Sequence, residues 1–275
     1  MRSIAIINQK GGVGKTTTAV NLSAALAASG QRIGLVDLDP QAHASLHLGL
    51  GPHREVPNIY EVLTGSRQLG DVWQQAEPNL WVAPSHIDLA AAEVELAGVV
   101  GRELILRDAL TEAARTPDGQ PFDTVLIDGP PSLGILTINA LAAVDDVLLP
   151  LQPHYLALHG LSKLLQTIDL VRRRLNDRLR LAGVVLCLFE SGTRLAAEVS
   201  ADVQAFFGDS TGRQAAWQDV HLFEARIRRN IRLAEAPSFE QSIFRYASQS
   251  AGADDYNALA EEVLALYAGK AASAA

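Results

Sequence analysis

The feature that most constrains this chain is a glycine-rich segment near its N-terminus, Gln9 to Thr18, which stands between an apolar strand and a helix. Ser3 to Ile7 is typical of a buried parallel strand, and Thr16 to Ser29 has the pattern of a helix that Gly30 ends. A helix that begins directly after such a loop presents unpaired N–H groups and the positive end of its dipole to a ligand. Because glycine lets the backbone approach phosphate oxygens closely, the segment predicts a nucleotide site.

The spacing within this loop differs from the ordinary phosphate loop, G-x-x-x-x-G-K-[ST]. Gln9 stands where the first glycine is expected, and an additional lysine, Lys10, follows it. This is the deviant Walker A pattern, whose signature residue is the early lysine. We expect Lys15 to reach the β and γ phosphates, the Thr16 hydroxyl to bind Mg²⁺, and Thr17 to contact a neighbouring phosphate. The complete expected phosphate and Mg²⁺ loop is Lys10, Gly11, Gly12, Val13, Gly14, Lys15, Thr16 and Thr17.

Carboxylates follow two further predicted strands. Asp128 comes directly after Val125 to Ile127, which is the Walker B arrangement of an acid that holds Mg²⁺ through a coordinated water. Asp39 follows the predicted strand Arg32 to Val36, and we expect it to position the attacking water and to contribute to the Mg²⁺ shell; Asp37 is a weaker candidate for that shell. Ligands of open parallel sheets bind outside the carboxyl ends of the strands, which places these acids beside the loop. Taken alone, an aspartate after a strand is equally typical of a turn or a helix cap.

Alternating apolar strands and amphipathic helices predict the α/β class, as one doubly wound, mostly parallel sheet with helices on both faces. The 275 residues, 48% of them hydrophobic, are enough for one large core, so we assign residues 1–268 to a single domain and 269–275 to a frayed tail. Further strands are expected at Arg32–Val36, Leu80–Ala83, Thr124–Ile127, Val147–Leu151 and Leu181–Leu188. Further helices are expected at Ile59–Leu63, Asp88–Leu96, Glu103–Ala114, Leu158–Leu175, Leu195–Phe207 and Asp254–Ala268.

Composition excludes several classes of protein. No stretch reaches the roughly 18 apolar residues of a membrane span, and no signal peptide is visible, so we expect a cytoplasmic protein with no membrane contact. Cys187 is the one cysteine; it lies in an apolar run, which predicts a buried strand side chain and excludes a disulfide framework. The net charge of −8 argues against a wholly basic surface, although arginines cluster at Arg226–Arg232 and Arg172–Arg180.

Together these motifs resemble the ParA/Soj family of chromosome and plasmid partition ATPases, a branch of the deviant Walker A group of P-loop NTPases. The resemblance runs from about Ile4 to Leu266. Besides the phosphate loop it rests on three segments, which are Val36 to Gln41, Ile127 to Gly134, and Asn230 to Ser238. It implies ATP and Mg²⁺ as cofactors, and slow ATP hydrolysis that a partner stimulates.

The resemblance also implies a mechanism shared between two subunits. In this family two copies face each other across two nucleotides, and the signature lysine, here Lys10, reaches the phosphates bound by the opposite copy. The ATP-dependent homodimer binds double-stranded DNA without sequence preference, which places it on the nucleoid. A ParB-type centromere-binding protein stimulates hydrolysis and releases it.

Residue by residue, the resemblance assigns DNA contacts to Arg194, Arg229 and Arg232, whose charges would neutralise phosphates. It assigns adenine contacts to Asn230, and to Arg228 where the family usually has proline. Solvated surface arginines remain the alternative interpretation of each cluster.

Other departures from the family are local. The stretch Gly208 to Leu222 is longer than the usual connection and is expected to be a loop, and Ala42-His43 replaces the usual Gly-Asn. His43 and His47 have helical spacing for a shared metal but no acidic or cysteine companions, so we do not expect a metal there.

Two other functions are compatible with these motifs. One is a MinD-type ATPase that positions cell division, which shares most of the catalytic residues but binds membranes. The predicted last helix carries Glu261 and Glu262 on its polar side, whereas a membrane-surface helix favours a basic polar face. The other is a nucleotide-gated binding switch with negligible turnover, which only a turnover measurement separates from an ATPase.

Overall fold

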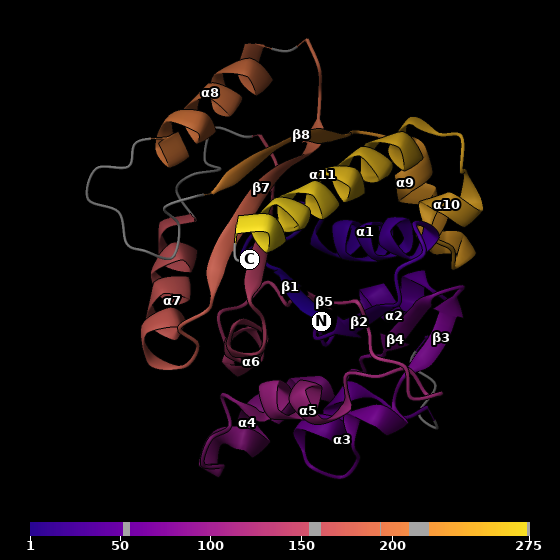
Figure 1. Ribbon diagram of the computed structural model, residues 1–275, viewed down its shortest axis with the longest axis vertical. Coiled ribbons are helices and arrows are strands. Elements are labelled where there is room, and N and C mark those ends of the chain that lie inside the picture. The colour runs from indigo at the N-terminus through magenta and orange to yellow at the C-terminus, as the bar shows by residue number, and fades with distance from the viewer. Residues whose placement is uncertain (52–55, 154–160, 193, 209–219, 274–275) are drawn as a thin grey trace.

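The core of the molecule is one eight-stranded sheet with the strand order β3-β4-β2-β5-β1-β6-β7-β8 (Figure 1). The computed structural model describes residues 1–51, 56–153, 161–192, 194–208 and 220–273. All neighbouring strands pair in parallel except β3 and β4, which are antiparallel. The strands are β1 (Arg2–Ile6), β2 (Ile33–Asp37), β3 (Gln74–Glu77), β4 (Leu80–Ala83), β5 (Thr124–Asp128), β6 (Asp146–Leu151), β7 (Arg180–Phe189) and β8 (His221–Arg228).

Helices cover both faces of this sheet and enclose two hydrophobic cores. One core joins the sheet to α3 (Ile59–Leu63), α4 (Leu89–Glu95), α5 (Ile105–Ala113), α6 (Ile135–Ala143), α7 (Leu161–Arg174) and α8 (Arg194–Gly208). The other joins it to α1 (Lys15–Ala28), α2 (His43–His47), α9 (Ile231–Glu235), α10 (Ile243–Tyr246) and α11 (Ala251–Ser273). Short 3₁₀ helices lie at Leu69–Asp71, Leu96–Gly98 and Ala236–Phe239. The doubly wound, mostly parallel α/β class expected from the sequence is confirmed.

The register of the central strands brings their carboxyl ends together. β5 lies between β1 and β2, and Asp128 at its end is level with Ile6 on one side and with Asp37 on the other. The loop after β1, the turn after β2 and the last residue of β5 therefore meet at one edge of the sheet.

Most of the expected elements are present, with boundaries shifted by one or a few residues. The expected strand Leu80–Ala83 and helix Ile59–Leu63 have the predicted bounds. The first residues of the expected helix Leu158–Leu175, and most of the stretch Gly208 to Leu222, lie outside the described residues. Within that stretch Gly208 ends α8, and His221 and Leu222 begin β8, a strand that was not predicted.

Three of the elements that were missed in the sequence were missed for different reasons. β8 alternates buried and exposed residues from Phe223 to Arg228, a period-two signal of an edge strand that we did not use. α6 is apolar nearly all round, so it lacks the periodicity that indicates a helix. β3 is a short, polar edge strand.

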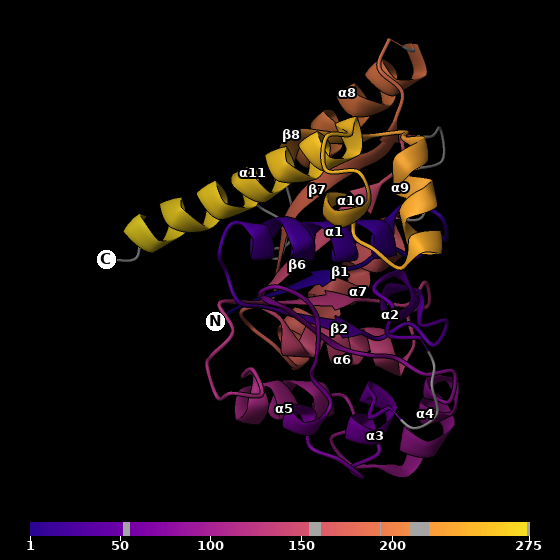
Figure 2. The ribbon, with the colours of Figure 1, turned by 90° about the vertical axis from the view of Figure 1, so that its right-hand side faces the viewer.

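The C-terminal helix α11 is longer than predicted. It continues to Ser273, which corrects the expected end at Ala268 and the expected frayed tail from residue 269; residues 274–275 are not described. Its buried side includes Tyr256 and Leu259 and packs on α1 and β8. Figure 2 shows its C-terminal end projecting past the rest of the chain.

Candidate nucleotide site

The loop between β1 and α1 has the backbone shape of a phosphate cradle. Gly12 and Gly14 have φ values of 71° and 91°, a left-handed conformation that side chains with a Cβ rarely adopt. Gly14 precedes the first residue of α1, and no side chain caps that helix end. The first N–H groups of α1 therefore remain available to an anion, as the sequence predicts.

Lys15 is unusually buried for a lysine. Lys15 is only 7% exposed, and its Nζ donates a hydrogen bond to the backbone carbonyl of Lys10 at 3.1 Å. Burial lowers the pKa of Lys15, while the nearby carboxylates of Asp128 and Asp39 act in the opposite direction. A lysine held in this way is a fixed donor with little hydration, which suits contact with phosphate oxygens.

Asp128 is fully buried at the end of β5, and among the described residues neither of its carboxylate oxygens has a hydrogen-bond partner. Burial, followed by the charge of Asp37, raises the pKa of Asp128 well above its ordinary value; the Thr16 hydroxyl and the Lys15 ammonium oppose this rise. Buried polar atoms without partners are rare in native proteins. Two orphaned carboxylate oxygens close to a threonine hydroxyl fit a site for Mg²⁺, a cation that prefers oxygen ligands.

Asp39 and Asp37 have different environments although both follow β2. Asp37 is fully buried and accepts hydrogen bonds from the backbone N–H of Asp39 and from both the N–H and the hydroxyl of Ser45, at 2.7 to 3.2 Å. Burial raises the pKa of Asp37 to about 6, against the effect of the Ser45 hydrogen bonds. Its carboxylate thus anchors α2 to the end of β2. Because the Asp37 carboxylate already accepts these hydrogen bonds, Asp39 is the better candidate of the two for contact with a ligand.

The backbone around Asp39 is held by a second set of contacts. Ser85 donates its hydroxyl to the carbonyl of Asp39 at 2.7 Å, and its N–H to the hydroxyl of Ser45 at 2.9 Å. The Asp39 side chain accepts the N–H of Gln41 at 3.0 Å. Asp39 is therefore fixed in position while its carboxylate still lines a cavity.

That cavity has a volume of about 440 Å³, and most of the residues predicted for phosphate binding line it. It is lined by Gly11, Gly12, Gly14, Lys15, Thr16, Thr17, Asp39, Gln41, His43, Pro131 and Leu188. Lys10 and Val13 do not line it: the Lys10 side chain is exposed, and Val13 is buried. Sequence analysis did not assign ligand contacts to Gln41, Pro131 or Leu188, and it considered His43 only as a metal ligand.

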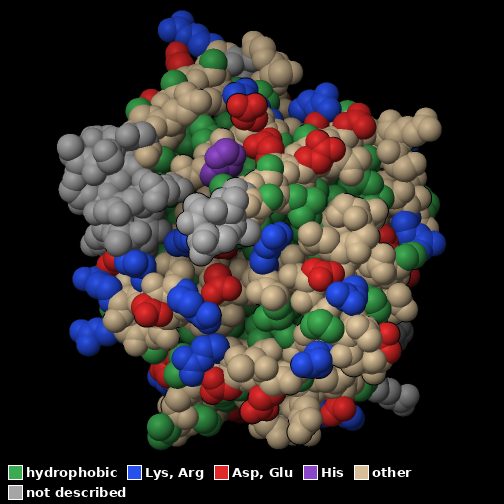
Figure 3. Space-filling view, in the orientation of Figure 1, with side chains coloured by type: hydrophobic (Ala, Val, Ile, Leu, Met, Phe, Trp, Pro, Cys, Tyr) green, Lys and Arg blue, Asp and Glu red, His purple; other side chains and the backbone are tan. Residues whose placement is uncertain are grey.

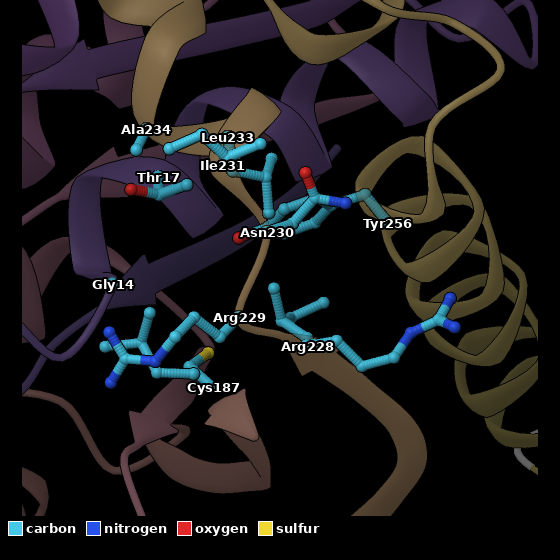
Figure 4. Close-up of a pocket in the computed structure, with 12 residues that line it drawn as sticks. Gly14, Thr17, Cys187, Arg228, Arg229, Asn230, Ile231, Leu233, Ala234 and Tyr256 are labelled. Carbon is cyan, nitrogen blue, oxygen red and sulfur yellow. The ribbon is translucent and has the colours of Figure 1, made fainter. Parts of the chain in front are cut away.

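A second cavity of about 460 Å³ adjoins the first and shares Gly14, Thr17 and Leu188 with it. Its walls are mostly apolar and come from the ends of β7 and β8, from α9 and from α11 (Figure 4). An apolar cavity next to a phosphate cradle is suited to a nucleotide base.

The two residues predicted to contact adenine both line this cavity, in different ways. Asn230 caps α9, because its side-chain oxygen accepts the N–H of Arg232 at 2.8 Å. The Arg228 guanidinium points away from the cavity toward α11, where its Nε is 2.9 Å from an oxygen of Asp255 (Figure 4). Arg228 therefore offers the cavity its backbone and stem rather than its charge.

The three arginines predicted to contact DNA are exposed, and each is paired with a carboxylate of the same chain. Their partners at 2.8 Å are Glu198 for Arg194, Glu190 for Arg229 and Glu235 for Arg232. Figure 3 shows basic and acidic side chains interspersed over one face of the molecule, in line with its net charge of −8. Exposed pairs of this kind are weak, so phosphate groups can replace the carboxylates.

Two further residues singled out in the sequence, Cys187 and His47, are buried in the structure. Cys187 is buried and free, as predicted, and burial raises the pKa of its thiol to about 12. His47 is also buried, which lowers its pKa to about 4. Within the described part of the chain no group of three or more His, Cys, Asp or Glu side chains is arranged to hold a metal.

Comparison with known proteins gives a consistent result. A family model described as an AAA domain matches residues 1–181. The chromosome partitioning protein ParA of Caulobacter vibrioides is 44% identical over 276 residues, which cover 100% of this chain and 98% of that protein. The sporulation initiation inhibitor protein Soj of Bacillus subtilis is 44% identical over 263 residues, which cover 95% of this chain and 98% of that protein.

A solved structure with a different name has the same fold. It is cobyrinic acid a,c-diamide synthase from Mycobacterium smegmatis with a bound ATP analogue and magnesium, with a TM-score of 0.78 and 35% identity over 96% of this chain and 94% of that one. The relatives named as partitioning proteins are more similar in sequence over essentially the same length. The phosphate loop, the Walker B acid and these full-length similarities agree: the chain belongs to the ParA/Soj family of chromosome-partitioning ATPases.

Proposed function

We propose that this protein binds ATP with Mg²⁺, hydrolyses it slowly, and uses the cycle to segregate chromosome or plasmid DNA. One observation carries the proposal: both carboxylate oxygens of Asp128 are buried, have no hydrogen-bond partner among the described residues, and lie near the Lys15 ammonium. Lys15 is the first residue of α1, whose N-terminus follows the glycine-rich loop. Such an acid is suited to binding a cation and such a helix end favours an anion, and Mg²⁺-ATP supplies both.

The chain's own residues account for binding and for activation of water. The loop N–H groups and Lys15 neutralise the phosphate oxygens, and the charge that develops on them during phosphoryl transfer. Asp39, held by Ser85 and by its own contact with Gln41, accepts a hydrogen bond from the attacking water and orients it. Thr16 and Asp128 hold Mg²⁺, which when bound supplies further positive charge at the phosphates.

We further infer that ATP joins two copies of the chain into a dimer through Lys10. Its side chain is exposed, whereas its backbone carbonyl is engaged by Lys15. An exposed ammonium at the rim of a phosphate cradle can reach a triphosphate bound to a second copy. The γ-phosphate would then join the two subunits, and its loss by hydrolysis would separate them.

We also infer that the dimer binds DNA non-specifically through Arg194, Arg229 and Arg232, and that a ParB-type protein stimulates hydrolysis. The support is the exposure of these arginines and membership of the partition family. Association with the nucleoid and a cytoplasmic location follow from non-specific DNA binding. Contacts with phosphates make this binding strongly dependent on salt.

The features that separate a membrane-associated, MinD-type relative from a partition ATPase lie in the C-terminal helix. The described helices include none with the length and apolar character needed to cross a bilayer. As far as Tyr267, α11 packs on its own molecule, and Glu262 accepts hydrogen bonds from the N–H groups of Glu224 and Ala225 on β8. These contacts favour a C-terminal helix that packs as part of its own domain over one that binds a membrane.

Sedimentation of the wild type tests the proposal directly. The protein is run with ATP, ADP or no nucleotide, each with and without random-sequence duplex DNA, and phosphate release is measured in parallel. We expect a dimer with ATP alone, and co-sedimentation with DNA that depends on ATP. Turnover above background identifies an ATPase, whereas ATP-dependent assembly without phosphate release would identify a binding switch.

A further inference from the structure

Leu188 has a backbone conformation that is unusual for its residue type. Its φ of 52° lies in the left-handed region, which costs a bulky side chain more than glycine, asparagine or aspartate. The other described non-glycine residues with positive φ are Ala42, Asn79 and Glu240, which stand at helix ends or in the turn between β3 and β4. Leu188, in contrast, lies inside strand β7. Strain of this kind concentrates at functional sites.

The strand pairing explains how the chain accommodates this conformation. Cys187 is level with Ile227 of β8, but Phe189 is level with Arg228, so two steps along β7 correspond to one step along β8. Leu188 is the extra residue of a β-bulge and has no partner in the ladder. Bulges redirect a side chain out of the alternating pattern of a strand, and they are frequent next to active sites.

Leu188 is also placed between the two cavities of the nucleotide site. It lines the phosphate cavity together with Lys15 and Asp39, and it lines the apolar cavity together with Asn230 and Tyr256. A nucleotide with its phosphates in the first cavity and its base in the second must pass this side chain. Phosphates alone would occupy the first cavity, where an apolar side chain offers their oxygens neither a hydrogen bond nor a charge, so their binding would depend little on Leu188.

We propose that Leu188 is a specificity-determining residue, which the bulge holds against the nucleoside part of the bound nucleotide. The inference rests on the proposed ATP site and adds the residue through which that site distinguishes a nucleoside triphosphate from a bare polyphosphate. Its physical basis is apolar contact with the base and sugar, which the left-handed conformation makes possible at a position where a regular strand would direct the side chain elsewhere.

The test compares two ligands in variants at this position. Dissociation constants for Mg²⁺-ATP and for Mg²⁺-tripolyphosphate are measured by calorimetry in the wild type, Leu188→Gly and Leu188→Met. We expect Leu188→Gly to weaken ATP binding by roughly 10-fold or more, because an apolar contact is lost, and to leave tripolyphosphate binding unchanged. Leu188→Met retains apolar reach and should keep the wild-type affinity for both ligands.

Asn79→Gly provides a matched control. It relieves a positive φ of 60° at an exposed turn that lies in neither cavity, so it should change neither affinity. Should Leu188→Gly not fold, as judged by its thermal midpoint, Leu188→Ala serves in its place.

Two results would overturn the assignment of Leu188. One is an equal loss of ATP and tripolyphosphate affinity, which would mean that the residue only supports the fold of the site. The other is unchanged ATP affinity after the side chain is removed. A wild-type protein that binds no ATP would instead refute the proposed function itself, so the two failures are distinguishable.

Discussion

The Nζ of Lys15 donates a hydrogen bond to the backbone carbonyl of Lys10 at 3.1 Å, so the two lysines of the phosphate loop are linked while their side chains face different surroundings. Lys15 is buried near Asp128 and Asp39, whereas the Lys10 side chain is in solvent. Lys15 is therefore placed to contact a nucleotide bound to its own subunit, and Lys10 is placed to contact a ligand or a protein outside it. Substitutions at the two positions should separate nucleotide binding from dimerisation.

Lys15→Ala should abolish ATP binding, because it removes the buried ammonium that faces the phosphates. The measurement is the shift of the thermal midpoint with Mg²⁺-ATP, which a ligand produces only if it binds the folded state. The wild type should shift and the variant should not. Normal ATP affinity in Lys15→Ala would refute the assignment of the phosphate loop.

Lys10→Ala should retain ATP binding as a monomer and lose ATP-dependent dimerisation. Its side chain is exposed, and the backbone carbonyl that accepts the Lys15 hydrogen bond remains in the variant. Analytical ultracentrifugation with ATP measures the dimer, and calorimetry measures binding. A full complement of ATP-bound dimers in this variant would show that Lys10 does not act across the interface.

Asp39→Ala should reduce ATP turnover by roughly 100-fold or more, as expected when a group that orients the attacking water is lost. The backbone of this segment should keep its position, because Ser85 bonds the Asp39 carbonyl and Ser45 bonds Asp37. ATP-bound dimers should therefore persist for longer on size-exclusion chromatography. Turnover at the wild-type rate would remove Asp39 from the reaction.

Arg232→Ala should weaken DNA binding and lower the slope of log affinity against log salt by about 0.9, the change expected for one lost phosphate contact. ATP affinity should not change. Arg107→Ala is the control, because Arg107 also pairs with a carboxylate, that of Asp108 at 3.0 Å, and its side chain is 38% exposed, but it lies on α5. An identical salt slope in the wild type and Arg232→Ala would place Arg232 outside the DNA interface.

His47→Gln should make stability less sensitive to acid. Burial lowers the pKa of His47 to about 4, below the value near 6.5 of an unfolded histidine. The stabilisation from keeping this side chain neutral is present above about pH 6.5 and is lost as pH falls toward 4, a loss on the order of 3 kcal/mol.

The measurement for His47 is the free energy of unfolding by urea at pH 7.5 and at pH 4.5, in the wild type and in His47→Gln. Asp37, whose pKa is raised to about 6, changes stability in the opposite direction over this range, but it is present in both proteins and cancels in the comparison. An equal drop in stability in both proteins would contradict the prediction.

The sequence by itself determined the α/β class and the glycine-rich loop that we expect to bind phosphate. The reason is locality: the strand, the glycines, Lys15 and Thr16 are consecutive, and their backbone geometry follows from residue types within a few positions. The acids Asp39 and Asp128 were also predictable, because parallel strands of one sheet bring their carboxyl ends to a common edge.

Only the tertiary structure decided the shape of the apolar cavity proposed for the base, and the contacts of the charged groups around the site. Which of Asp37 and Asp39 faces the cavity depends on Ser45 of α2, and the direction of Arg228 depends on Asp255 of α11. The bulge at Leu188 arises from pairing between β7 and β8, which the sequence pattern did not reveal. These features are contacts between segments far apart in the chain, and local residue preferences do not specify their register or their pairing.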